Sequence, residues 1–344
     1  MKWRVRHIVF FLLAMLLMMV TTQCGSASHG GGRNLVFEQG CYPYAVMWEG
    51  KCYYTMQLES ADSIVLYEAK SAELLSKGNR RVVWHADSMS HIWSPELHRI
   101  NDKWYLYFEA DDGNTDNHQL YVLENPSENP MSGEFKLKGA IKTNDEWNFG
   151  LHPTSVIVEG KQYLLWSGWE NRRKETETQC IYIARMENPW TLSSERVMLS
   201  KPELEWERQW INPNGDRSNY PIFVNENPEA FVTPDGRHVC VCYSASGIWT
   251  VYHSLGMLHA RTDADLLDPN SWTKELEPLF VPDDVNKMYG TSNISLLNIQ
   301  EGEQPEMLYE ANVLMDGQWH RGIWVQQIKW NKNGLPEFGK PLSD

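Results

Sequence analysis

A short pattern recurs along the chain and constrains its fold more than any other feature: a strand led by proline, a tight turn and a second strand. The copies lie about 50–75 residues apart, which suits the four-stranded blades of a propeller. They begin at Tyr42-Pro43, Ser94-Pro95, His152-Pro153 and Asn227-Pro228, and a degenerate fifth copy begins at Ser292-Asn293. The repeat therefore predicts an all-β, five-bladed β-propeller. No Pro/Ser-rich linker divides residues 34–344, so we expect a single domain there.

The repeat also ranks candidate functional residues. Equivalent positions of successive blades converge on the central axis of a propeller, and the residue before each proline starts the innermost strand. We therefore expect one central pocket ringed by Tyr42, Ser94, His152, Glu226–Asn227 and Ser292.

The N-terminal segment predicts export. Residues 1–7 are basic, and Ile8–Val20 is an apolar stretch of secretory length that is short for a membrane span. Cys24 and the glycines after it resemble a bacterial lipoprotein signal, with residues 1–23 removed, a lipid on Cys24 and residues 24–33 as a tether. The expected location is the cell envelope, anchored by lipid. The alternative is ordinary cleavage near Ser26-Ala27-Ser28, which would give a soluble periplasmic or secreted protein.

Charge and composition exclude several partners. With 31 basic and 45 acidic side chains the net charge is −14, which argues against nucleic acid. Walker and GxGxxG motifs are absent, which argues against nucleotides, and Trp166-Ser167-Gly168 lacks the glycines of a serine hydrolase elbow. Aromatic residues make up 12% of the chain, which suits either sugar stacking or the packing of many short strands.

The cysteines after Cys24 predict no metal site, because no Cys/His spacing suggests zinc. Cys41 and Cys52 flank a predicted turn, so they could pair. Cys240 and Cys242 lie two apart on one predicted strand and point the same way. Buried thiols are otherwise the expectation.

Several segments resemble glycoside hydrolase family 43, whose members include arabinofuranosidases and xylosidases with five-bladed propellers. The resemblance is densest in residues 91–98, 103–113, 117–125, 165–170 and 243–247. It implies a hydrolase that cleaves plant-wall oligosaccharides containing arabinose or xylose.

The family's chemistry is inversion by two carboxylates, in which a base activates water and an acid protonates the leaving oxygen. Asn225-Glu226-Asn227-Pro228 matches the acid's turn, so the resemblance makes Glu226 the acid, and burial among aromatic rings predicts a raised pKa. Tyr42 stands at the family's base position and His152 at that of the aspartate that tunes the acid. Ser292 falls at the position of the family's central histidine, which often helps to hold an axial ion through water. The resemblance therefore leaves an axial calcium possible, and no other cofactor is assigned.

Two functions remain open at this point. In the first, which we favour, the chain is a glycosidase with an altered catalytic set: Glu226 is the acid, and the base is Glu96, Glu109, Asp111, Asp112, Glu229 or His152. A variant of this hypothesis uses Tyr42 as a nucleophile. In the second, the protein is a catalytically inactive, carbohydrate-binding lipoprotein. In both, the residues expected to bind the oligosaccharide are Trp93, Trp166, Trp169, Asn227, Trp249 and Ser292.

Overall fold

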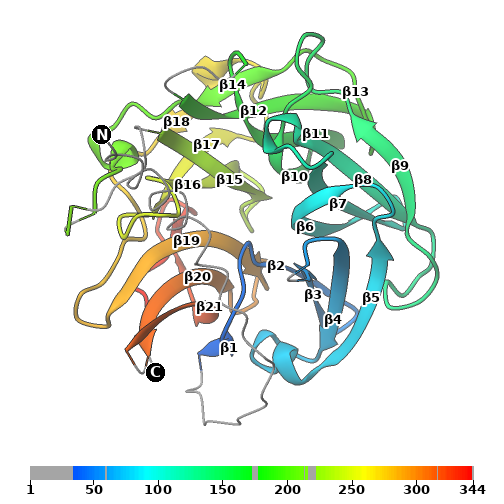
Figure 1. Ribbon diagram of the computed structural model, residues 1–344. Helices are drawn as coiled ribbons and strands as arrows, with labels where there is room; N and C mark the ends of the chain where they lie inside the picture. Colours follow the sequence, from blue (N-terminus) through cyan, green and yellow to red (C-terminus); the bar gives the residue numbers. More distant parts are fainter. Residues whose placement is uncertain are drawn as a thin grey trace, which may run out of the picture. The chain divides into compact units, whose positions relative to one another are not determined.

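The computed structural model describes residues 34–58, 60–172, 177–212, 214–215, 222–315 and 317–342. The predicted signal, tether and lipid-bearing Cys24 lie outside these residues. Residues 32–344 form one compact unit in which nearly all regular structure is strand. Figure 1 shows the sheets arranged around a central axis, with each inner strand nearest the axis. The expected all-β propeller is confirmed.

The strands group into antiparallel meanders that follow one another along the chain. The first contains β2 (Tyr44–Trp48), β3 (Lys51–Gln57), β4 (Ser63–Ala69) and β5 (Asn79–His85). The second contains β6 (Ser90–Ile100), β7 (Lys103–Asp111), β8 (Gln119–Asn125) and β9 (Lys136–Ile141). The third contains β10 (Leu151–Val158), β11 (Lys161–Trp169) and β12 (Glu177–Asn188), with β13 (Thr191–Leu192) and β14 (Val197–Ser200) paired to β12.

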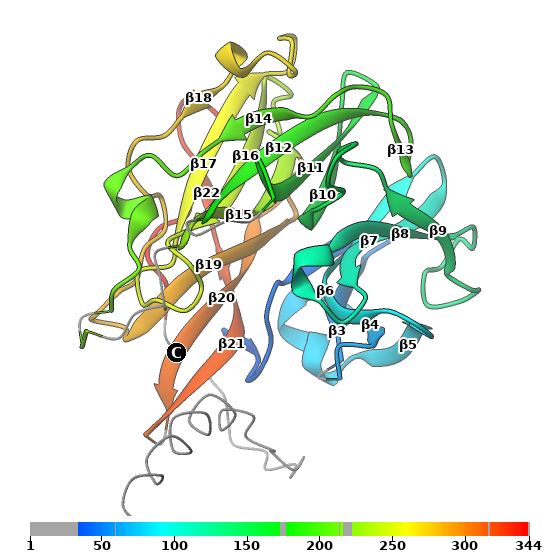
Figure 2. The same ribbon diagram turned by 45° about the horizontal axis from the view of Figure 1, so that its top comes forward.

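The fourth meander contains β15 (Ile222–Val232), β16 (His238–Ala245), β17 (Ser254–Arg261) and β18 (Thr273–Lys274). A parallel pairing of β12 with β15 joins it to the third. The fifth contains β19 (Met288–Leu297), β20 (Glu306–Met315) and β21 (Gln318–Gln327), which lie side by side in both views (Figures 1 and 2). Short elements complete the described residues: β22 (Lys329–Trp330), β23 (Pro336–Glu337) and the 3-10 turns Ala72–Lys77, Thr115–Asn117, Glu205–Arg208 and Pro269–Ser271.

The N-terminal strand β1 (Leu35–Phe37) completes the last meander rather than the first. It pairs antiparallel with β21, with Leu35 opposite Trp324 and Phe37 opposite Ile323. The chain then passes directly to β2 of the first meander. The two ends of the repeat are therefore joined by strand pairing, which closes the ring.

The core lies between neighbouring meanders. Each of its hydrophobic clusters combines two consecutive sheets; Leu66 of the first packs with Leu106 of the second in this way. The sheet faces are lined by large aromatic side chains, and Trp104 and Trp166 are among those fully buried. Much of the chain's aromatic content therefore serves strand packing.

The described cysteines are free thiols, so the pairing of Cys41 with Cys52 is not formed. Cys41 instead accepts a hydrogen bond from Nε2 of Gln57 at 3.0 Å. Cys240 and Cys242 share one face of β16 and pack in the same hydrophobic cluster. In the part of the chain that the structure describes, no helix has the length and apolar character needed to span a membrane.

Candidate active site on the propeller axis

A left-handed residue interrupts each innermost strand near the axis. The backbone φ is positive, between 45° and 51°, at one equivalent residue near the start of each inner strand: Tyr42, Ser94, His152, Asn227 and Asn293. Asn227 belongs to the expected pair Glu226–Asn227, whereas in the last meander the residue is Asn293, one position after the expected Ser292. Such conformations cost energy for residues other than glycine and persist where surrounding contacts hold them.

The contacts that hold these residues come from the preceding meander. The backbone N–H of His152 donates to Oε2 of Glu109 at 3.1 Å, and that of Tyr42 to Oε2 of Glu310 at 3.2 Å. The N–H of Asn227 and that of Asn293 donate to serine hydroxyls in the same way. The buried carboxylates Glu109 and Glu310 are thus already engaged in positioning the backbone.

Glu226 lies between two imidazoles. Its Oε2 is 3.8 Å from Nε2 of His152, and its Oε1 is 3.5 Å from Nε2 of His253. Gln179 donates a further hydrogen bond to Oε2 at 3.3 Å. Burial is the largest single influence on the pKa of Glu226 and raises it, but the two histidines together lower it to about 2. The expectation of a raised pKa is therefore wrong, and Glu226 is ionised in the free protein.

His152 links the first three inner strands. Its Nδ1 lies 2.6 Å from the hydroxyl of Ser94 and 3.4 Å from Oε1 of Glu109, and its ring centroid is 4.9 Å from that of Tyr42. Burial lowers the pKa of His152 most strongly, but the carboxylates of Glu109 and Glu226 outweigh burial, so the pKa is raised above 6.5. The two carboxylates thus favour the protonated form of His152.

Tyr42 fills the space between His152 and Arg321, whose guanidinium carbon is 5.4 Å from the centre of the tyrosine ring. Burial raises the pKa of its hydroxyl above the ordinary value, although Arg321 opposes this. Among the hydrogen bonds of the described residues, none joins this hydroxyl to Glu226, the contact that a nucleophilic role requires. The geometry therefore favours a Tyr42 side chain that occupies the position of the family's base over one that acts as an activated nucleophile.

His253 is the axial residue that sequence reasoning missed. Its side chain is fully buried, and its Nδ1 lies 2.6 Å from the hydroxyl of Ser292. Ser292 is fully buried too, so it orients His253 and does not reach a sugar directly. His253 lies just before β17 at the end of a loop, outside the repeated hairpins, so the repeat held no signal for it.

Comparison with known proteins assigns the family. The profile of glycosyl hydrolases family 43 matches residues 36–336, most of the described fold. The chain belongs to this family.

Characterised members of family 43 align over most of this chain. An extracellular exo-α-(1→5)-L-arabinofuranosidase of Streptomyces avermitilis is 33% identical over 309 residues, which cover 86% of this chain and 60% of that protein. α-L-Arabinofuranosidase 43 of Humicola insolens is 30% identical over 307 residues, with the same coverage. The chain therefore spans about three fifths of the length of these relatives. The crystal structure of an α-L-arabinofuranosidase from Lactobacillus brevis superposes with a TM-score of 0.78 at 30% identity, covering 90% of this chain and 96% of that one.

Glu96, another candidate base, lies on β6, further along the strand than the axial Ser94. It follows the left-handed Ser94 by two positions, and its Oε2 is 2.9 Å from Nε2 of His98. Burial and the neighbouring Glu229 raise its pKa well above the ordinary value, and burial raises that of Glu229 to about 8. The raised pKa values favour the protonated carboxyls, which are poor proton acceptors, so the geometry gives Glu96 and Glu229 little support as the base.

The remaining carboxylate candidates are held elsewhere. Asp111 accepts contacts from Nδ1 of His91 at 2.9 Å and Nδ1 of His118 at 3.0 Å. Asp112 is exposed and bonds the amide of Asn117.

The tryptophans that were expected to bind the oligosaccharide differ in their exposure to solvent. Trp166 is fully buried in the core and cannot present a face to a ligand, so its expected role is wrong. Trp169 is buried in a stack with Phe149 at 4.4 Å, and half-buried Trp93 stacks on His118 at 4.5 Å. Asn227 is also buried. Trp249 is 41% exposed, which makes it the freest of the four tryptophans.

The axial side chains do not fit a directly bound metal ion. Among the described residues, no group of three or more His, Cys, Asp or Glu side chains is arranged to hold one. Nδ1 of His253 lies 2.6 Å from the hydroxyl of Ser292, whereas its buried Nε2 lies 3.5 Å from Oε1 of Glu226 and has no hydrogen-bond partner among the described residues. We therefore route no chemical step through a metal.

Proposed function

We propose that the chain is a glycoside hydrolase that acts on arabinose-containing polysaccharides through an altered catalytic set, with Glu226 as proton donor. The observation that carries the proposal is the position of Glu226 on the axis between His152 and His253. The arabinofuranosidase relatives support the substrate class.

The low pKa of Glu226 is compatible with this role if the proton is shared. The raised pKa of His152 and the lowered pKa of Glu226 favour the proton on His152 in the free protein. A bound sugar ring expels water from the pocket, and exclusion of water disfavours an ion pair relative to two neutral groups. Sugar binding thus favours transfer of the proton from His152 to Glu226, from which the glycosidic oxygen takes it.

A second candidate, sugar binding without turnover, is favoured by one specific observation. Tyr42 occupies the expected base position, and the nearby carboxylates of Glu109 and Glu310 accept backbone N–H groups instead of facing a free ligand. Water activation by a carboxylate therefore has no evident residue in the described part of the axis. In this reading the same pocket retains a sugar through shape and hydrogen bonds alone.

The deciding experiment is a hydrolysis screen on arabinose-containing oligosaccharides, with the product anomer followed by NMR. Wild type should release arabinose, and Glu226→Gln should lower turnover roughly 10²–10⁴-fold while binding changes little, since Gln keeps the shape. A Glu226→Gln variant as fast as wild type would show that Glu226 is not the donor. Binding without release of sugar by either protein would establish the second candidate.

We also propose that the protein is exported and held at a membrane by lipid on Cys24. The support is the sequence of residues 1–24, together with the extracellular description of the Streptomyces relative. Cys24→Ala should move the protein from the membrane fraction to the soluble fraction. If fractionation is unchanged, the anchor does not depend on Cys24.

A further inference from the structure

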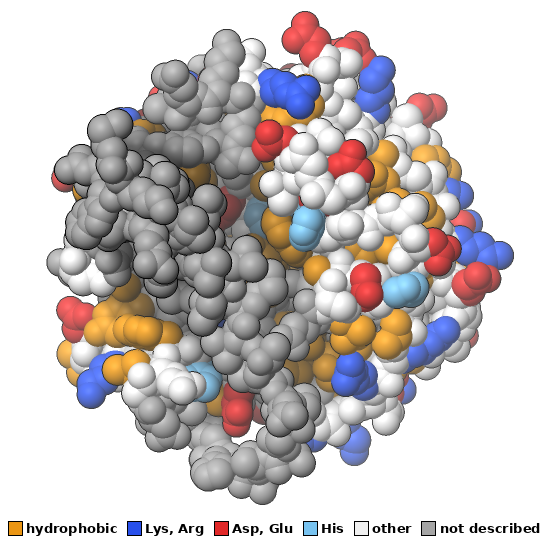
Figure 3. Space-filling model, in the orientation of Figure 1, with side chains coloured by type: hydrophobic (Ala, Val, Ile, Leu, Met, Phe, Trp, Pro, Cys, Tyr) orange, Lys and Arg blue, Asp and Glu red, His pale blue; other side chains and the backbone are white. Residues whose placement is uncertain are grey.

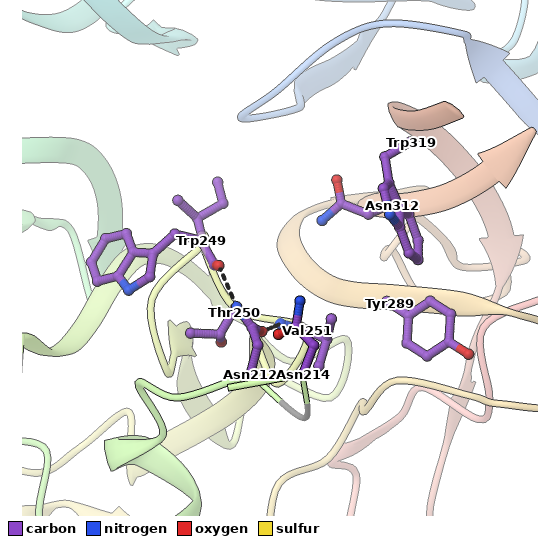
Figure 4. Close-up of a pocket in the computed structure, with 9 residues that line it drawn as sticks. Asn212, Asn214, Trp249, Thr250, Val251, Tyr289, Asn312 and Trp319 are labelled. Carbon is purple, nitrogen blue, oxygen red and sulfur yellow. Dashed lines mark hydrogen bonds between the residues drawn. The ribbon is translucent and has the colours of Figure 1, made fainter. Parts of the chain in front are cut away.

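A pocket of about 420 Å³ lies beside the axis, between a loop that follows β16 and the strands of the last meander. Figure 4 shows Trp249, Thr250 and Asn212 on one side and Tyr289, Asn312 and Trp319 on the other. On the described part of this face, the space-filling view shows apolar side chains interspersed with charged ones (Figure 3). None of the axial residues described above lines this pocket.

The loop side of the pocket is held in a fixed shape. The Asn212 side chain spans the loop: its Oδ1 accepts the backbone N–H of Val251 at 2.9 Å, and its Nδ2 donates to the carbonyl of Trp249 at 3.3 Å. Gly247 has a φ of +41°, and a Cβ there would lie 2.4 Å from the Trp249 ring. The Trp249 indole thus packs against a bare backbone while 41% of the residue stays exposed.

The opposite side presents aromatic faces and an amide. Tyr289 and Trp319 contact each other edge to face, with centroids 5.6 Å apart, and Trp319 is 58% exposed. A Cβ on Gly290 would lie 2.6 Å from Nδ2 of Asn312, so the glycine makes room for that amide. Among the hydrogen bonds of the described residues, none uses the Asn312 side chain, which leaves its amide available to a ligand.

The chemistry of the lining selects a class of ligand. The described lining residues are aromatic, aliphatic, amide and hydroxyl side chains, and none of them carries a charge: Asn212, Asn214, Ile248, Trp249, Thr250, Val251, Tyr289, Asn312 and Trp319. Aromatic faces pack on the C–H faces of sugar rings, and amides bind hydroxyls. A uronic acid carboxylate would find no cation among these residues, and the net charge of −14 repels polyanions.

Both sides of the pocket lead directly to the axial residues. The N–H of Gly290 donates to the carbonyl of Val251 at 3.3 Å and bridges the two sides at the pocket's inner end. His253 lies two residues after Val251, and Ser292 lies two residues after Gly290. These two side chains contact each other, and His253 faces Glu226. If the terminal sugar of an oligosaccharide reaches Glu226, its next sugar units therefore lie beside this pocket.

We propose that the pocket is a subsite for uncharged sugar units of an oligosaccharide whose terminal unit lies at the axis, with Trp249 and Trp319 as stacking surfaces and Asn312 as a hydroxyl ligand. This inference rests on the proposed function for the identity of the oligosaccharide. The subsite makes affinity depend on chain length and on the absence of uronic acids.

Calorimetric titration of the full chain tests the proposal without requiring turnover. The probes are arabinose, neutral arabino-oligosaccharides of increasing length and oligogalacturonate, titrated into Glu226→Gln to prevent hydrolysis and into wild type at short times. Affinity should rise with arabino-oligosaccharide length. Trp249→Ala and Trp319→Ala should each weaken the longer probes roughly tenfold, the loss of about 1.4 kcal/mol, while leaving arabinose itself nearly unchanged. Trp249→Phe, which keeps an aromatic face, should restore most of the affinity.

Leu137→Ala is the matched control, because Leu137 is an exposed apolar residue on β9 of the second meander, and it should bind every probe as wild type does. Thermal melts confirm that each variant is folded. Length-dependent binding that the tryptophan variants lose would establish the subsite even if no hydrolysis is found, so failure of the proposed function is separately visible. Equal affinity for all lengths, full affinity in both alanine variants, or oligogalacturonate bound as tightly as the neutral probe would overturn the proposal.

Discussion

The carboxylate of Glu226 and the imidazole of His152 form a buried pair, and each group affects the stability of the fold in a different pH range. The lowered pKa of Glu226, about 2 against 4.5, contributes stability that is present above pH 4.5 and is lost as the pH falls towards 2. The raised pKa of His152 contributes stability that is complete below pH 6.5 and is lost as the pH rises through the raised value. The pair therefore stabilises the fold most between about pH 4.5 and 6.5.

The pH response of His152 gives a direct prediction at this scale. An NMR titration should place its pKa above 6.5, and Glu226→Gln should lower that pKa, because the carboxylate that favours the imidazolium is gone. Glu109, Glu310, Ser94 and Tyr42 also face the ring and remain in the variant.

His85 serves as the reference, because its side chain is 59% exposed and it lies in the first meander on β5. Its imidazole NMR signals should not respond to the Glu226→Gln substitution. An unchanged pKa of His152 in the variant would show that Glu226 and His152 are not electrostatically coupled.

Single residues also show which parts of the site a sequence can reveal. Tyr42, His152 and Asn227 occupy equivalent positions of the repeat and Glu226 directly precedes Asn227, so the repeat predicted these residues near the axis. His253 comes from a loop that belongs to no repeat unit, and its contact with Glu226 depends on how that loop packs. His152 and His253 both lower the pKa of Glu226, so an expectation from burial alone had the wrong sign.

At the scale of elements, the inner hairpins turn through left-handed residues. Glu49-Gly50, Asn101-Asp102 and Glu159-Gly160 each have two consecutive positive φ values, as tight hairpin turns of primed type require. Glycine and asparagine adopt this conformation at low cost, whereas glutamate does not. The turns were predictable from Gly and Asp at these positions. The one-residue shift at Asn293 was not, because the degenerate fifth copy has no proline to mark the position.

The turn between β10 and β11 therefore offers a pair of opposite predictions. Gly160→Ala should lower the free energy of unfolding by about 1 kcal/mol, through backbone strain alone, since a Cβ there would meet nothing within 4 Å. Glu159→Asn should raise it by roughly 0.5 kcal/mol, because asparagine tolerates the left-handed region better. Urea denaturation measures both. Equal stability of Gly160→Ala and wild type would mean that the turn relaxes to another conformation.

At the scale of the whole molecule, the ring depends on a strand of three residues. β1 is separated from its partner β21 by most of the sequence, yet it completes the sheet of β19, β20 and β21. Val36 is buried with Leu308 and Ile323, and the ring of Phe37 stacks on Tyr54 of the first meander at 4.9 Å. The strand thus bridges the last sheet and the first, where the ring would otherwise open. The hairpin repeat predicted the propeller fold, but it contained no signal for this pairing, because β1 lies outside every repeated hairpin.

Because the three-residue strand β1 closes the ring, we predict that its one buried side chain, Val36, affects the stability of the whole ring. Val36→Ala should lower the free energy of unfolding by roughly 1–3 kcal/mol, the cost of removing buried methyl groups from a packed site. Because β1 holds the first and last sheets together, hydrogen exchange should also accelerate in β2, β3 and β21 before the interior sheets. Val82→Ala on β5, where the side chain is 49% exposed, is the control and should stay within about 0.5 kcal/mol of wild type. If Val36→Ala destabilises all sheets equally, the ring unfolds as one unit and β1 is not its weakest joint.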